Sequence, residues 1–154
     1  MLKIDTTKSL EELENDYWEE RDTYETSLVE TIYRIRKKSL DQLTPGDIRY
    51  FIGQNLGNDY IVSLALNLLE ENPYVLGTYY EGDLLMGILH IEIEFWMDHK
   101  KLLNRLIGIM DNVNRNFTEE IEELIPDFIK NEINYNWKEL LKRTVKTYNN
   151  AKNI

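Results

Sequence analysis

The chain of 154 residues contains no cysteine, and it has only two histidines, three prolines and seven glycines. The absence of cysteine excludes disulfides, thiolate metal sites and cysteine nucleophiles, and it fits a reducing compartment. Long apolar runs are also missing. The two longest, residues 61–69 and 84–93, are interrupted by polar side chains, and neither approaches the roughly 18 apolar residues of a membrane span. No apolar stretch follows the N-terminal residues, so we expect a cytoplasmic protein without a secretory signal.

Charge is abundant and unevenly distributed, with a net charge of −10. Residues 1–31 hold ten acidic and three basic side chains, and residues 73–99 hold five acidic side chains and no lysine or arginine. By contrast, residues 100–154 hold ten basic and eight acidic side chains. The acidic segments argue against direct binding to nucleic acid and favour a basic partner. Solubility alone is the alternative explanation of this charge.

Helix-capping signals indicate an all-α fold. Ser9 and Glu12 have the spacing of a capping box, and Thr44 stands before Pro45 at the start of another helix. We predict one domain over residues 1–154, a bundle of about six or seven helices with frayed ends at 1–8 and 149–154. The predicted helices span about 9–17, 26–38, 44–55, 59–71, 83–107 and 118 onward, the last divided at Pro126 or Asn134.

Residues 89–95 allow a second interpretation, because apolar and polar residues alternate there with the period of a β-strand. We favour a helix, since the apolar spacing continues into Leu102, Leu106 and Ile107 without a turn signal. No second convincing strand is present to pair with it.

Signals for catalysis are weak. His90, Glu94 and Asp98 would share one face of a helix, with His99 beside them, so a small metal-dependent enzyme is one hypothesis. A helical di-metal site uses Glu-x-x-His pairs on two helices, and the chain contains no such pair. Phosphate-binding loops and nucleophile elbows are also absent. We therefore favour a solvated charged face and expect no enzyme activity, no metal and no cofactor.

Aromatic residues beside acids are the stronger signal, because aromatic anchors within a charged surround are typical of interface centres. Core packing would explain any one of these aromatics equally well, and only their position among the acids favours an interface. The basic stretch from Lys100 to Arg115 is predicted to be a core-facing helix rather than a membrane-surface helix. The predicted partner-binding residues are Asp16, Trp18, Glu19, Glu20, Asp22, Tyr79, Glu81, Glu92, Glu94 and Asp98.

A series of short motifs in residues 9–97 resembles the immunity proteins of contact-dependent growth inhibition (CDI) systems. From about Lys100 onward the chain shows no such likeness. The motifs are Ser9–Glu14, Leu43-Thr44, Asp47–Arg49, Ile52–Gln54, Leu64–Leu66, Leu68–Pro73, Tyr80–Leu85 and Trp96.

The resemblance implies a bacterial cytoplasmic protein that neutralises a toxin domain encoded beside it and delivered by a surface protein. Many such toxins are nucleases, whose active sites bind phosphate and are often basic, so an acidic inhibitor is physically reasonable. The resemblance also suggests structural roles for Gly53 and Gly82, and a pair formed by Arg49 and Asp83. The alternative function is a helical adaptor or regulatory protein that binds another basic partner.

Overall fold

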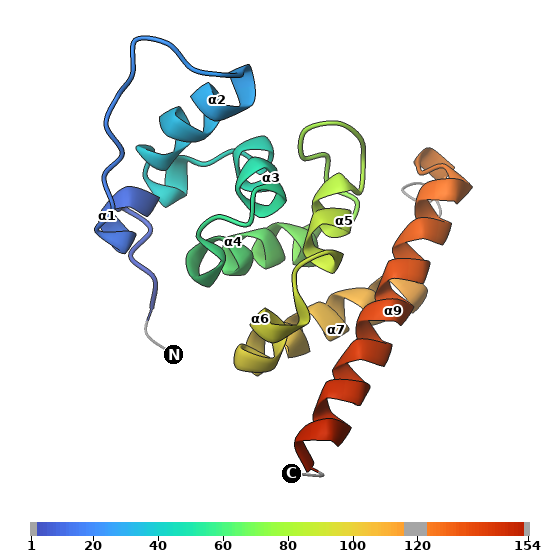
Figure 1. Cartoon of the computed structure of the whole chain (residues 1–154). Helices are drawn as coiled ribbons and strands as arrows, with labels where there is room; N and C mark the ends of the chain where they lie inside the picture. The colour runs from blue at the N-terminus through green and yellow to red at the C-terminus, as the bar shows by residue number, and fades with distance from the viewer. Residues whose placement is uncertain (1–2, 116–122, 153–154) are drawn as a thin grey trace.

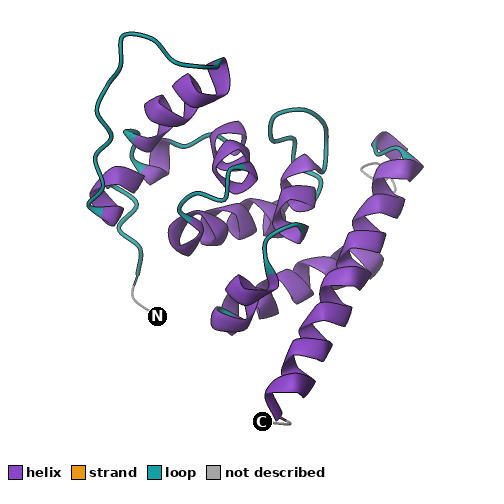
Figure 2. Cartoon of the chain, viewed as in Figure 1, coloured by secondary structure: helices purple, strands orange, loops and turns teal. Residues whose placement is uncertain are grey.

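A computed structural model describes residues 3–115 and 123–152, and these residues form helices and loops with no strand (Figure 2). The predicted all-α fold is therefore confirmed. A short 3-10 helix, η1, spans Leu40–Gln42. The α-helices of the described residues are α1 (Leu10–Glu14), α2 (Ser27–Arg36), α3 (Pro45–Gly53), α4 (Asn58–Glu71), α5 (Asp83–Leu89), α6 (Ile93–Asp98), α7 (Lys100–Arg115) and α9 (Asp127–Lys152).

Side-chain caps fix the starts of the first three α-helices, as predicted. The Glu12 amide donates to the Ser9 hydroxyl at 3.3 Å, and the Ser9 amide donates to the Glu12 carboxylate at 2.7 Å. Thr26 caps α2, and Thr44 forms a second capping box at α3. These bonds satisfy backbone amides that a helix leaves unpaired in its first turn. Helix α1 ends earlier than predicted, because Asn15 adopts a left-handed conformation with φ of 52°.

The predicted continuous helix over 83–107 is wrong. The chain instead forms α5, α6 and α7, with breaks at His90–Glu92 and at His99. Glu92 is extended, with φ of −56° and ψ of 143°, and this redirects the chain before α6. The apolar spacing looks continuous in the sequence because each of the three helices buries an apolar residue of its own. These residues are Leu89 in α5, Trp96 in α6 and Leu102 in α7. The strand interpretation of 89–95 is also wrong, since its last three residues begin α6.

Helix α9 is uninterrupted across Asn134, so of the two predicted division points only Pro126, just before its first residue, lies at a helix boundary. The capping signal predicted at Thr118 lies outside the described residues.

Parts of the two end segments make contacts with the rest of the described chain. The carbonyls of Thr6 and Lys8 accept hydrogen bonds from η1 amides at 3.0 and 2.9 Å. At the other end, residues 149–152 continue α9, where the Lys152 ammonium lies 4.6 Å from the centre of the Tyr148 ring one turn earlier. This contact favours the helical conformation of the last turn.

Helix α4 lies at the centre of the arrangement and packs against α3, α5 and α7 (Figure 1). Helices α1 and α2 lie at one side of the molecule, and α9 runs along the other side against α5 and α6. Helix α7 buries its apolar face, as expected, and Arg105 joins it to α4 through hydrogen bonds to Glu70 at 2.7 and 3.0 Å. Within residues 3–115 and 123–152, no helix is long and apolar enough to cross a membrane.

Candidate functional site

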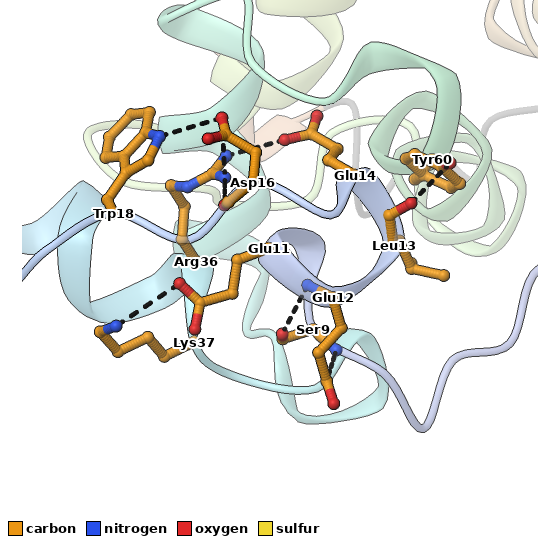
Figure 3. Close-up of polar contacts among 10 residues, drawn as sticks. All are labelled: Ser9, Glu11, Glu12, Leu13, Glu14, Asp16, Trp18, Arg36, Lys37 and Tyr60. Atoms are coloured by element: carbon orange, nitrogen blue, oxygen red, sulfur yellow. Dashed lines mark hydrogen bonds and ion pairs between the residues drawn. The ribbon is translucent and has the colours of Figure 1, made fainter.

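A buried arginine on α2 fixes the acidic segment that follows α1 (Figure 3). Arg36 is only 1% exposed. Its guanidinium donates to the Glu14 carboxylate at 2.9 Å and to the Asp16 carbonyl at 2.7 Å. The same group lies 4.2 Å from the centre of the Trp18 ring. These contacts neutralise a buried charge and hold residues 14–18 against α2.

Further contacts position α1 beneath this segment. Lys37 donates to the Glu11 carboxylate at 3.4 Å, and the Tyr60 hydroxyl of α4 donates to the Leu13 carbonyl at 3.3 Å (Figure 3). The left-handed Asn15 then turns the chain away from α1. The start of the acidic segment is therefore anchored through α1 and through Arg36 of α2, although residues 16–26 contain no regular structure.

A shallow hollow of about 370 Å³ lies on this segment, lined by Trp18, Glu19, Glu20, Arg21 and Tyr33. We call it the acidic hollow. The Trp18 and Tyr33 rings form part of its lining, with their centres 5.0 Å apart. Arg21 lies 5.2 Å from the centre of the Tyr33 ring and is itself paired with a glutamate. Aromatic faces beside free carboxylates can bind a lysine or arginine side chain from a partner.

The predicted residues of the first cluster have two different roles. Asp16 and Trp18 contribute to the structure, because the Trp18 indole donates to the Asp16 carboxylate at 3.1 Å and both contact Arg36. Glu19, Glu20 and Asp22 are exposed and make no hydrogen bond or ion pair with the described residues. These three acids are therefore available to a partner.

The predicted residues of the second cluster are exposed but lie in two places. Tyr79, 69% exposed, and Glu81 lie on the loop before α5. The buried Asp83 carboxylate shapes this loop by accepting hydrogen bonds from three successive backbone amides, residues 77–79, at 2.7 to 2.8 Å.

The other members of the second cluster, Glu92, Glu94 and Asp98, lie on α6 or directly before it. Helix α5 has seven residues and so separates them from the loop by roughly 10 Å. The second cluster is thus not one continuous patch.

The stripe of the alternative metal-enzyme hypothesis does not form on one helix, because the break after α5 separates His90 from Glu94 and Asp98. The His90 Nδ1 donates to the Met86 carbonyl at 2.7 Å, and the His99 Nδ1 donates to the Phe95 carbonyl at 2.8 Å. Among the described residues, no group of three potential ligands is arranged to hold a metal ion.

Three residues of this site, Arg21, Tyr33 and Arg36, were not among the predicted binding residues. Arg36 lies one helical turn after Ile32 and next to Ile35, and all three are on the buried face of α2. Its position on the apolar face of α2 was visible in the sequence, but its partners Glu14, Asp16 and Trp18 come from another part of the chain and were not.

The structure is thus an all-α protein with an exposed acidic segment beside the Trp18 and Tyr33 rings. A sequence profile described as CDI immunity proteins matches residues 12–106, from α1 to within α7. The chain therefore belongs to the CDI immunity protein family, which makes it an immunity protein against a CDI toxin. The acidic hollow lies inside the matched region, whereas α9 lies outside it. Comparisons with curated proteins and with solved structures gave no match.

Proposed function

We propose that this protein neutralises its toxin by binding, with the acidic hollow receiving a lysine or arginine side chain of the toxin. The arrangement of the hollow carries this proposal: two unpaired glutamates lie beside the Trp18 and Tyr33 rings. Carboxylates attract a cation, and ring faces stabilise it by about 0.5–2 kcal/mol. Because Arg36 fixes the segment in advance, binding loses less conformational entropy than it would with a free loop.

The toxin is proposed to be a nuclease. A nuclease must bind a phosphate backbone and therefore presents basic residues, which an acidic protein of net charge −10 attracts. The proposed action is occlusion of this basic surface in the cytoplasm, without catalysis by the immunity protein. Its proposed partner is the cognate toxin domain at the C-terminus of a surface-delivered CDI protein.

The second cluster is proposed to steer the encounter. Tyr79, Glu81, Glu92, Glu94 and Asp98 are all exposed, and no lysine or arginine occurs in residues 73–99 to offset the acids. Long-range attraction to a basic toxin raises the association rate, and salt screens it over about 8 Å at physiological ionic strength.

Growth rescue tests the neutralising function. The toxin domain encoded beside this chain is co-expressed with the immunity protein, and growth is compared with toxin alone. Restored growth supports the proposal, whereas continued killing by a toxin shown to be co-expressed with soluble immunity protein would refute it. A nuclease assay on the purified toxin, with and without the immunity protein, tests the proposed toxin class.

Association kinetics test the acidic hollow. The double charge reversal Glu19→Lys with Glu20→Lys should slow association about tenfold at low salt and reduce its salt dependence. The matched control reverses two exposed acids on α9, Asp127 and Glu132. Stopped-flow measurements over a range of salt concentrations provide both values. Equal association rates for the two double variants would contradict a role of the hollow.

A further inference from the structure

A second cleft, of about 350 Å³, lies between α3 and α5, which pack side by side. Arg49, Ile52 and Gly53 line it from α3, and Met86 and Gly87 line it from α5. The residues that join α5 to α6 complete its walls. Its volume is near the lower end of the roughly 300–1,000 Å³ typical of ligand pockets. The cleft is separate from the acidic hollow and shares no residue with it.

Two glycines, Gly53 and Gly77, make room for the arginine of this cleft, and a third, Gly87, lies beside it. A Cβ atom at Gly53 would lie 2.4 Å from an Arg49 terminal nitrogen, and a Cβ at Gly77 would lie 2.9 Å from the Arg49 Cβ. A Cβ at Gly87 would lie 3.5 Å from the Arg49 Nε. A side chain at position 53 would displace the guanidinium from its present place. The glycines therefore leave the space that the Arg49 side chain occupies along the cleft.

Arg49 has no partner among the described residues. It makes no hydrogen bond or ion pair, and its Nε is buried and unsatisfied. The pair with Asp83 suggested by the sequence does not form, because the Asp83 carboxylate is occupied by three backbone amides. Other arginines that contact the core, Arg36 and Arg105, are both paired with carboxylates. Burying part of an arginine without a partner costs free energy that a pairing anion would recover.

We propose that this cleft receives an aspartate or glutamate side chain of the toxin, which pairs with Arg49. This inference rests on the proposed toxin-binding function. A carboxylate fits better than a phosphate dianion, because Glu92 also lines the cleft and residues 73–99 carry five acidic side chains and no lysine or arginine. A dianion would meet repulsion there, whereas a single carboxylate finds one guanidinium. The apolar side chains of Ile52 and Met86 would contact the methylene groups of the ligand.

The cleft would therefore act oppositely to the acidic hollow. The hollow accepts positive charge from the toxin, and the Arg49 cleft accepts negative charge. A basic protein with the wrong arrangement of charges could satisfy only the first of these sites. The Arg49 cleft thus adds selectivity for the cognate toxin to the general attraction between acidic and basic surfaces.

The test measures toxin binding by wild-type protein, Arg49→Gln and Arg49→Lys. Arg49→Gln should raise Kd roughly 30-fold or more, mainly through faster dissociation, as expected when one partner of a buried charge pair is removed. Arg49→Lys should show a smaller loss, because lysine keeps the positive charge, but not wild-type affinity, because it cannot form the bidentate pair. Arg143→Gln, which removes a charge from an exposed position of α9, is the matched control and should leave Kd unchanged. Far-UV circular dichroism and the unfolding midpoint verify that each variant is folded.

A double-mutant cycle then identifies the toxin carboxylate. One acidic toxin residue, changed to its amide, should couple to Arg49→Gln, so that the double variant loses far less affinity than the two single losses combined. Unchanged affinity of a folded Arg49→Gln, or the absence of a coupled toxin acid, would overturn the inference. If Arg49 instead pairs with Glu92 in solution, Glu92→Gln would lower stability and Arg49→Gln would bind normally, which also overturns it. Failure of the wild-type protein to bind the toxin would refute the proposed function itself.

Discussion

Replacing Arg36 by methionine should both destabilise the protein and release the acidic segment. Methionine retains most of the apolar stem of the arginine but removes its charge and donors. The charged hydrogen bond to the Asp16 carbonyl, at 2.7 Å, is worth about 1.5–3 kcal/mol. Contact with the Trp18 ring at 4.2 Å adds about 0.5–2 kcal/mol.

The carboxylates reduce the net loss. Glu14 is 28% exposed and Asp16 is 61% exposed, so water can solvate both when the arginine is absent, and the Asp16 ion pair contributes little. Because these effects are not additive, we expect a loss of about 2–4 kcal/mol in the free energy of unfolding. The exposed Arg34 on the same helix provides the control Arg34→Met, which should change stability by no more than about 0.5 kcal/mol.

Urea unfolding at neutral pH measures the stability of both variants. Limited trypsin digestion measures the release of the segment, because Arg21 lies within it and should be cleaved faster in Arg36→Met than in Arg34→Met. A stability loss below about 1 kcal/mol would show that solvation compensates for the arginine. Unchanged cleavage after Arg21 would show that the segment does not depend on Arg36, and both results would refute the argument.

Burial alone would raise the pKa of Asp47. Hydrogen bonds from Lys38 and from the Thr44 backbone amide outweigh this effect, so the pKa lies below the ordinary 3.8. The ionised Asp47 carboxylate therefore stabilises the fold fully above about pH 3.8, and this contribution is lost as the pH falls through the lowered pKa. The free energy of unfolding of Asp47→Asn, measured in urea between about pH 2 and 5, should depend less on pH than that of the wild type. Gly57→Ala should lower the unfolding midpoint, because φ is +65° and the new Cβ would lie 2.6 Å from Leu10, at a cost of about 1–3 kcal/mol. Gly108→Ala, with nothing within 4 Å of the new Cβ in α7, should instead stabilise by about 0.5–1 kcal/mol, and an equal effect of the two substitutions would contradict this reasoning.

The helix starts could be predicted because they depend on local chemistry. A serine or threonine cap acts within one turn, so Ser9 and Thr44 identify their helices without tertiary information. The breaks within 83–107 could not be predicted in this way. The residues at the breaks, such as His90 and Glu92, are acceptable inside a helix, and only the packing of α5, α6 and α7 against different neighbours requires the turns.

The acids of the proposed site were chosen from their clustering in the sequence and stay a prediction, whereas the residues that contact them were not predicted. Arg34 and Arg36 are alike in local sequence, but one is exposed and the other is buried beneath Trp18. Arg49 is likewise defined by glycines from other parts of the chain, among them Gly77 and Gly87. Such environments arise from tertiary contacts, which composition and periodicity do not encode.

The acidic segment is attached to the fold from one side only. Its contacts with α2 involve a backbone carbonyl and the side chains at positions 14–18, whereas Glu19, Glu20 and Asp22 make no hydrogen bond or ion pair with the described residues. Substitution at these three positions therefore removes no polar contact of the fold. Under the proposed function, a lineage can alter these acids in step with a diverging toxin, one residue at a time, without passing through unfolded intermediates.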